Sequence, residues 1–179
     1  MKKLNTRLVI ISGLLIALNI VLSRFVAIPG VINFGGFPII FGGIVFGPAV
    51  GGVVGGVGDV VSHFIRPTGP FMPHFTLTSA LTGIIPGFIV RILKMKLSAP
   101  SLWKIFVAIF IGQVTTSVIL VPYFRNVLFD HPLLVTMTKA AIRQAVNIPV
   151  YTIIMKPLIK AVSRILGSWQ DDVIYNSKN

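Results

Sequence analysis

The chain has 179 residues, of which 54% are hydrophobic and only 11% are charged. A soluble domain carries about 25% charged residues, so this composition excludes a soluble protein and favours one largely buried in lipid. The absence of cysteine excludes disulfide frameworks, thiol catalysis and cysteine-ligated metals. The net charge of +12 raises the hypothesis of a nucleic-acid partner. The positions of the basic residues along the chain decide whether this hypothesis is needed.

The N-terminus predicts a membrane-spanning helix over about residues 8–28. Lys2, Lys3 and Arg7 precede an apolar run of about 20 residues, the length needed to cross some 30 Å of hydrocarbon. A signal peptide also begins with basic residues before an apolar run, but no small-residue cleavage site follows here. We therefore interpret this run as a retained first helix.

The next apolar stretch, Phe37 to Ile65, has 29 residues and is interrupted by Gly47-Pro48. One helix of this length would be longer than a bilayer is thick. Because Gly-Pro is a strong turn signal, we predict two helices over residues 37–46 and 49–65.

Three further apolar runs predict helices over residues 75–93, 105–124 and 134–166. Prolines inside the first and the last of these predict kinks or tilts rather than helix ends. Together the runs predict an all-α fold: a polytopic membrane protein with a six-helix bundle in a single domain, residues 1–179.

The basic residues predict the orientation of this bundle. If both termini lie on one side, that side carries eleven of the sixteen Lys and Arg residues and the opposite side five. The positive-inside rule then places both termini in the cytoplasm, which explains most of the net charge without nucleic acid. The five residues on the opposite, outer side are Arg24, Arg66, Arg125, Lys139 and Arg143.

The outer side is therefore positive, with Asp59 in a span and Asp130 in an outer loop as its acidic residues. A charged group inside a span usually faces an interior cavity and marks a binding pathway. This indicates a ligand with one or more carboxylates, held by Arg24 or by the deeper Arg143. The alternative for Arg24 is that it reaches lipid phosphates.

Arg143 and Asn147 are four residues apart and share a helix face, with Tyr151 one turn further. A guanidinium, an amide and an aromatic ring are suited to hold a planar heterocycle or a carboxylate. The alternative is an ordinary polar contact between helices, which is common in membranes.

Glycine is concentrated between Gly42 and Gly58, with repeated spacings of four, and Gly13 and Ala17 repeat this pattern in the first helix. Small residues at this spacing let helices approach closely in lipid. They indicate either packing within the monomer or a groove for a partner subunit, and the spacing alone does not separate these alternatives.

Few residues here could perform catalysis. Asp59 is the only acid within a span, and His63, His74 and His131 lack metal-ligand spacing. No ATP-binding motif is present, so we predict no enzyme, no metal and no resident cofactor. A self-sufficient secondary transporter is an alternative, but neither ion-relay groups nor paired repeats are evident.

Five segments carry a resemblance to a known family, strongest between about residues 10 and 95. They are Leu22-Ser23-Arg24-Phe25, Gly36-Phe37-Pro38-Ile39-Ile40, Phe46-Gly47-Pro48, Gly51 to Asp59, and Phe71-Met72-Pro73-His74-Phe75-Thr76-Leu77. In these segments the chain resembles the substrate-binding S components of energy-coupling factor (ECF) vitamin transporters, in their folate-type branch.

The resemblance implies a multi-pass protein of a prokaryotic plasma membrane that captures a vitamin at the outer face. Folate is the first expectation, and another vitamin such as pantothenate is the alternative. It also implies docking on a transmembrane coupling subunit that carries two ATPases. The small residues that contact this subunit correspond to Gly13 and Ala17.

The resemblance also implies ligand-binding residues. Arg24 and Phe75 correspond to the arginine and phenylalanine that stack on the pterin ring. Asp59 and Asn147 are then suited to hydrogen-bond the ring edge.

A carboxylate of the ligand is expected on Arg143 or Arg66. His74 stands beside Phe75, where the family often has a small residue, and is expected to reshape the pocket.

Overall fold

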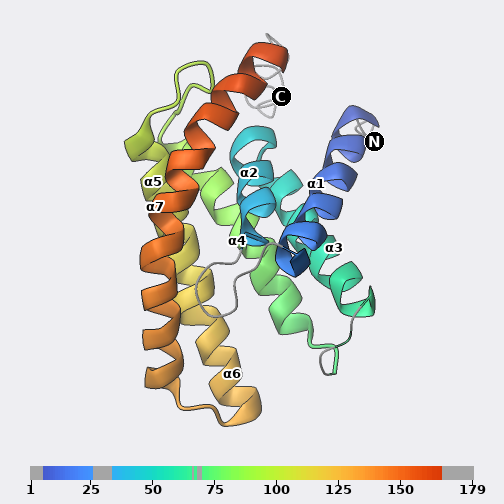
Figure 1. Cartoon of the computed structure of the whole chain (residues 1–179), viewed down its shortest axis with the longest axis vertical. Helices are drawn as coiled ribbons and strands as arrows, with labels where there is room; N and C mark the ends of the chain where they lie inside the picture. The colour runs from blue at the N-terminus through green and yellow to red at the C-terminus, as the bar shows by residue number, and fades with distance from the viewer. Residues whose placement is uncertain (1–5, 26–33, 66, 68–69, 167–179) are drawn as a thin grey trace.

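The computed structural model describes residues 6–25, 34–65, 67 and 70–166, which are helical apart from short turns (Figure 1). This confirms the predicted all-α class. The helices are α1 (Thr6–Phe25), α2 (Gly36–Phe46), α3 (Pro48–Ile65), α4 (Pro73–Ile92), α5 (Leu102–Gln113), the π-helical segment η1 (Val114–Leu120), α6 (Val121–Phe129) and α7 (Leu133–Leu166).

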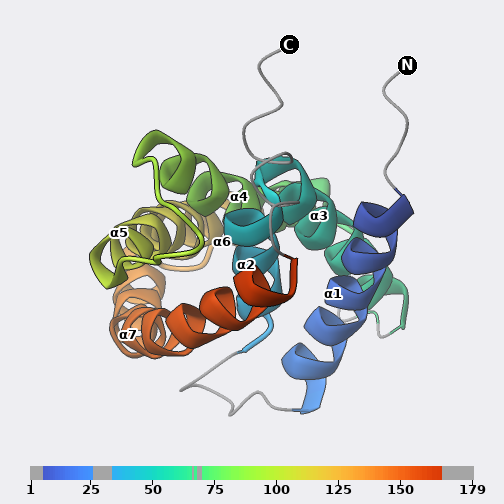
Figure 2. The same cartoon turned by 90° about the horizontal axis from the view of Figure 1, so that it is seen from above.

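Segments α5, η1 and α6 follow one another without a break and form one rod, Leu102–Phe129. This rod and helices α1, α3, α4 and α7 are each long and apolar enough to cross a membrane. Helix α2 has only 11 residues, about 16 Å of helix, roughly half the hydrocarbon thickness. It lies at the centre of the bundle when viewed from above, and nearly all of its residues are buried (Figure 2).

The Gly47-Pro48 signal does separate two helices. Gly47 has φ +104°, a conformation that favours glycine, and an added Cβ would also collide with the guanidinium of Arg91. Pro48 then begins α3, a position at which its missing N–H is not needed.

Glycines hold α2, α3 and α4 together at backbone contact. A Cβ on Gly51 would lie 2.6 Å from the Cα of Gly43 and 2.8 Å from the carbonyl carbon of Gly83. A Cβ on Gly43 would overlap the carbonyl oxygen of Gly83, and one on Gly87 that of Gly43. Gly55 approaches the carbonyl of Ser79 in the same way. We call Gly43, Gly51, Gly55, Gly83 and Gly87 the glycine seam; it packs within the monomer.

The rod of α5, η1 and α6 is longer than the predicted fifth helix. It runs from Leu102 to Phe129 instead of 105–124, so Arg125 lies on a helix and not in a loop. The polar residues after Phe124 indicated a loop, but a helix can continue past the apolar segment when its side chains reach water. The rod ends at Asp130, which adopts the left-handed conformation (φ 53°).

Helices α1 and α7 run in opposite directions through the bundle (Figure 1). The beginning of α1 and the end of α7 lie at the same end of the molecule, together with the turn at Gly47 and the α4–α5 connection (Figure 1). The turns before α4 and α7 lie at the opposite end. We call these the terminal end and the distal end.

Candidate functional site

A cavity of about 410 Å³ opens in the distal half of the bundle. Residues of α1, α2, α3, α4, the α5–α6 rod and α7 line it, and most of them are polar. In a protein whose surface faces lipid, such a concentration of polar groups marks a site that handles a polar ligand.

Four of the predicted site residues meet in this cavity: Asp59 from α3, Phe75 from α4, and Arg143 and Asn147 from α7. Tyr151, one turn beyond Asn147, also lines it, so the helix face recognised in the sequence does point inward.

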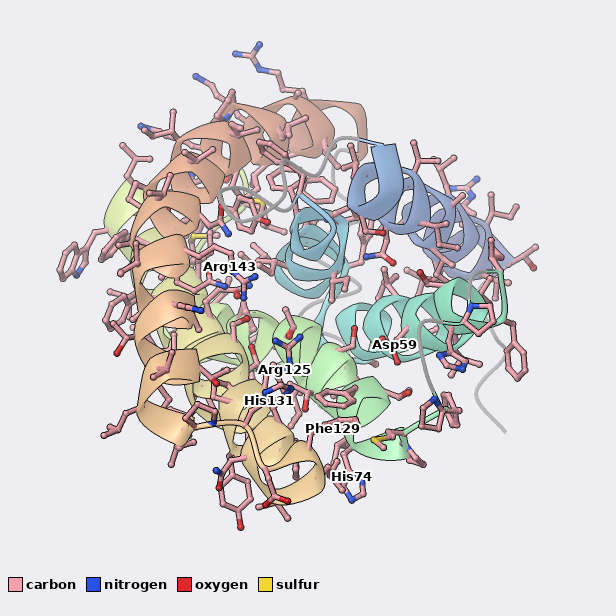
Figure 3. The ribbon with its side chains drawn as sticks, turned by 60° about the horizontal axis from the view of Figure 1, so that its bottom comes forward. Asp59, His74, Arg125, Phe129, His131 and Arg143 are labelled. Atoms are coloured by element: carbon pink, nitrogen blue, oxygen red, sulfur yellow. The ribbon has the colours of Figure 1, made fainter. Side chains whose placement is uncertain are left out.

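The other three predicted ligand-binding residues are not among the described lining residues of the cavity. Arg66 lies outside the described residues, and Arg24 is the penultimate residue of α1 with a side chain outside the description. His74 is not among the lining residues; its ring packs against Phe124 of α6, with 5.1 Å between centroids. Successive helix residues point in directions about 100° apart, which explains why Phe75 lines the cavity and His74 does not. Figure 3 shows His74 at the edge of the molecule, away from Arg125 and Arg143.

Asp59 is held in place from the neighbouring helix. The hydroxyl of Thr76 donates a hydrogen bond to Asp59 Oδ2 over 2.7 Å. Asp59 and Asp130 are the two acids of the described residues, and of these only Asp59 lines the cavity. The site therefore holds one carboxylate acceptor at a fixed position.

Three buried amides form the deeper wall. Gln113, Gln144 and Asn147 are 3%, 6% and 3% exposed. Ser117 donates to Gln113 Oε1 over 2.7 Å, which orients that amide and leaves its NH₂ group to act as donor. Gln144 Oε1 and Asn147 Oδ1 are buried without a hydrogen-bond partner among the described residues. A buried acceptor without a partner costs about 1–3 kcal/mol, so these amides are poised to gain stability from a ligand that donates hydrogen bonds.

Because of the π-helical segment η1, residues along one side of the rod all face the cavity. Gln113, Ser117, Val121 and Arg125 are spaced by four and all line it. In a regular α-helix, residues four apart drift by about 40° per step, and the wider π turn offsets this drift. Arg125 is thereby brought to the same wall as Gln113.

An aromatic group closes the inner end. Tyr151 is 2% exposed, and its ring packs edge-on against Phe37, with 5.7 Å between centroids, and against Phe34 at 6.1 Å. Phe75 is half-buried on the α4 side. The cavity thus offers aromatic surface as well as polar groups.

Asn19 attaches α1 to this site. Its Nδ2 donates to the carbonyl of Gly35 over 2.6 Å, and an added Cβ on Gly58 would lie 2.8 Å from Asn19 Oδ1. This bond fixes the distal half of α1 beside the beginning of α2.

Sequence reasoning missed Asn19, Gln113, Arg125 and Gln144 as cavity residues. The signal for three of them was present, since an amide inside an apolar run rarely faces lipid. Arg125 had no such signal, because its place depends on the register of η1.

These groups together suit a flat, polar heterocycle that carries an anionic substituent. A carboxylate and amides can pair with ring donors and acceptors, aromatic rings can cover its faces, and Arg125 and Arg143 can bind the anion. Figure 3 shows both arginines directed toward the centre of the distal end.

Comparisons with known proteins agree with this chemistry. The family model for the S component of ECF-type riboflavin transporters matches residues 3–164. The folate transporter FolT of Clostridium novyi (strain NT) is 29% identical over 168 residues, which cover 92% of this chain and 94% of that protein. A crystal structure of FolT bound with folic acid has a TM-score of 0.73 and 25% identity, covering 88% of this chain and 97% of that one.

Proposed function

The chain belongs to the family of S components of ECF-type riboflavin transporters, and we propose that it captures folate at the outer face of the membrane for ATP-driven uptake by partner subunits. It is a membrane transport protein of this family and not an enzyme.

The polar wall of the cavity is the observation that carries the choice of ligand. A pterin ring presents an amino group and a ring N–H beside acceptor nitrogens and a carbonyl. Asp59 and the amide oxygens of Asn147 and Gln144 accept from such donors, and the NH₂ group of Gln113 donates to the acceptors. Phe75 covers one ring face. The resemblance to folate-type S components assigns the other ring face to Arg24, near the distal end of α1.

The carboxylates of folate distinguish it from riboflavin, for which the family model is named. Arg143 is half-buried at the cavity wall and binds the anionic end of the ligand, with Arg125 beside it. Riboflavin has no carboxylate for these cations. Riboflavin therefore remains the second candidate on the family match alone, and folate is favoured by the charge of the site.

The sidedness follows from charge. Arg91, Lys94, Lys96 and Lys104 lie near the terminal end, as do the beginning of α1 and the end of α7. The positive-inside rule assigns this end to the cytoplasm, which leaves the cavity open toward the outside.

The outward face of α1 supports docking to a coupling subunit that carries two ATPases. Gly13 and Ala17 are exposed, and an added Cβ on Gly13 would meet nothing within 4 Å. Ile10 and Leu14 beside them are 66% and 71% exposed. This apolar face with small residues at its centre allows a partner helix to approach closely.

Ligand identity is tested on protein purified in mild detergent. Mass spectrometry of the bound small molecule and titration calorimetry with folic acid, riboflavin and pantothenate should identify folate. Trp103 is 70% exposed on the terminal half of α5, so tryptophan fluorescence is a poor reporter for this cavity. Binding of riboflavin or pantothenate with no binding of folic acid would overturn the proposal.

Two substitutions test the site itself. Asp59→Asn removes the charge that pairs with the ring donors and should weaken folate binding by about tenfold or more, the effect of a lost charge-assisted hydrogen bond. Asp130→Asn is the matched control, because Asp130 is exposed, lies outside the cavity and has a left-handed conformation that Asn tolerates. Equal affinities in both variants would remove Asp59 from the site.

A further inference from the structure

A second chamber of about 520 Å³ lies between the α6 part of the rod and the first half of α7. It shares Ser117, Val121, Arg125 and Arg143 with the main cavity, so the two spaces adjoin at the arginines. A ligand held in the main cavity can therefore extend past the two arginines into the second chamber.

The second chamber is strongly basic. Arg125, His131, Lys139 and Arg143 line it, and no carboxylate does. Asp130, the neighbour of His131, is exposed and is not part of the lining. A group of basic residues without an acidic partner in the lining attracts an anion.

The cations are arranged in steps away from the main cavity. Lys139 and Arg143 are four residues apart on α7, so their Cβ atoms lie about 6 Å apart on one face. On the other wall, the turn that carries His131 is held by a hydrogen bond from Asn126 Nδ2 to the His131 carbonyl over 2.8 Å. The chamber thus offers the two arginines that it shares with the main cavity, and Lys139 one helical turn beyond Arg143.

We propose that this second chamber binds the successive carboxylates of an oligo-γ-glutamyl tail, so that Lys139 and His131 make the protein selective for conjugated folates. This inference rests on the proposed function, since it needs a pteroyl ligand in the main cavity. Each γ-linked glutamate adds one carboxylate, and the steps from Arg143 to Lys139 supply partners for them. We name this space the tail chamber.

An anionic lipid headgroup is the competing occupant. A lipid phosphate would also be attracted to Lys139 and His131, but its binding would not depend on a ligand in the main cavity. The shared arginines favour a ligand that spans both spaces, because Arg125 and Arg143 line each of them.

The test compares three ligands by titration calorimetry: pteroic acid without glutamate, folic acid with one, and pteroyl-tri-γ-glutamate with three. For the unmodified protein at low salt, we expect the triglutamate to bind about tenfold more tightly than folic acid, the gain from one or two exposed charge pairs. Salt should reduce this advantage, because exposed charge pairs are screened.

Lys139→Ala should weaken triglutamate binding by about threefold to fivefold, and Lys139→Glu by about tenfold, with pteroic acid unaffected in both. Lys139 is exposed, and unchanged pteroic acid binding reports an intact main cavity in the same sample. Lys160→Ala is the matched control, because this exposed lysine lies near the terminal end of the same helix. It should leave all three affinities unchanged.

The outcomes separate the two proposals. If neither pteroic acid nor folic acid binds the unmodified protein, the proposed function fails, and the tail chamber with it. If both bind but the Lys139 variants change all three affinities equally, or none, the tail chamber alone is overturned. Loss of stabilisation by phosphatidylglycerol in Lys139→Ala, with unchanged ligand preference, would assign the chamber to a lipid and also overturn the inference.

Discussion

The glycine seam and the outward face of α1 share one sequence pattern but have opposite surroundings. In the seam, Gly43, Gly51 and Gly83 approach one another so closely that an added methyl group would collide with backbone atoms. On α1, Gly13 has open space around it and Ala17 is exposed. The pattern indicates that helix backbones can approach closely at both places. Among the residues that the structure describes, the seam has its partner within the chain and the outward face of α1 does not.

The difference follows from the size of α2. Helix α2, at the bundle centre, has only 11 residues and is too short to cross the membrane by itself. Helices α3 and α4 pack directly against it, with glycines at the points of closest backbone contact. Helix α1 instead contacts the bundle through its inward residues, of which Ser12, Leu15 and Asn19 are buried. Its other face is left for lipid or a partner.

The largest effect is expected in the seam. Gly51→Ala places a Cβ 2.6 Å from the Gly43 Cα, and neither backbone can shift without moving a helix. We expect a loss of about 1–3 kcal/mol of stability, seen as a lower melting temperature in detergent. Gly56→Ala is the control in the same helix, because its Cβ would lie 3.7 Å from that of Ala80, an ordinary contact. Equal melting temperatures would show that the seam has room for side chains.

The second prediction concerns α1. Gly13→Leu combined with Ala17→Leu should leave folate binding in detergent unchanged and reduce uptake in cells by more than about tenfold, because bulk at these positions blocks close helix approach. Ala145→Leu adds similar bulk to an exposed position of α7 and should preserve uptake. Full uptake by the double variant would mean that this face does not contact the coupling subunit.

A smaller effect is expected where α1 joins the bundle. Asn19→Ala removes the 2.6 Å hydrogen bond to the Gly35 carbonyl and should cost about 1 kcal/mol of stability. The measurement is the melting temperature with and without folate. An unaltered value in both states would show that α1 is held by apolar packing alone.

The smallest effect is expected for a polar contact beside the seam. Thr82 donates to the hydroxyl of Thr116 over 3.1 Å and links α4 to η1. Thr82→Val should cost about 0.6 kcal/mol, the average for such bonds between membrane helices. A loss as large as that of Gly51→Ala would mean that hydroxyl contacts rank with glycine packing in holding α4.

The candidate site could be predicted from the sequence where a residue is unusual for its own segment. Asp59, Arg143 and Asn147 are polar groups within apolar runs, and all three line the cavity. His74 was expected to shape the pocket because it adjoins Phe75, but neighbours on a helix face different ways. The place of Arg125 depends on the π turn of η1, which hydropathy does not reveal.

Composition and apolar run lengths alone determined that this is a helical membrane protein, because a bilayer requires about 20 apolar residues for each span. The Gly47-Pro48 turn signal indicated the break between α2 and α3, and the spacing of Arg143, Asn147 and Tyr151 indicated the inward face of α7. Only the tertiary structure decided which glycines have partners, and that Asp59, Gln113, Arg125 and Gln144 share one cavity. Hydropathy and helix periodicity are local properties, whereas the meeting of side chains from four segments depends on how closely their backbones pack.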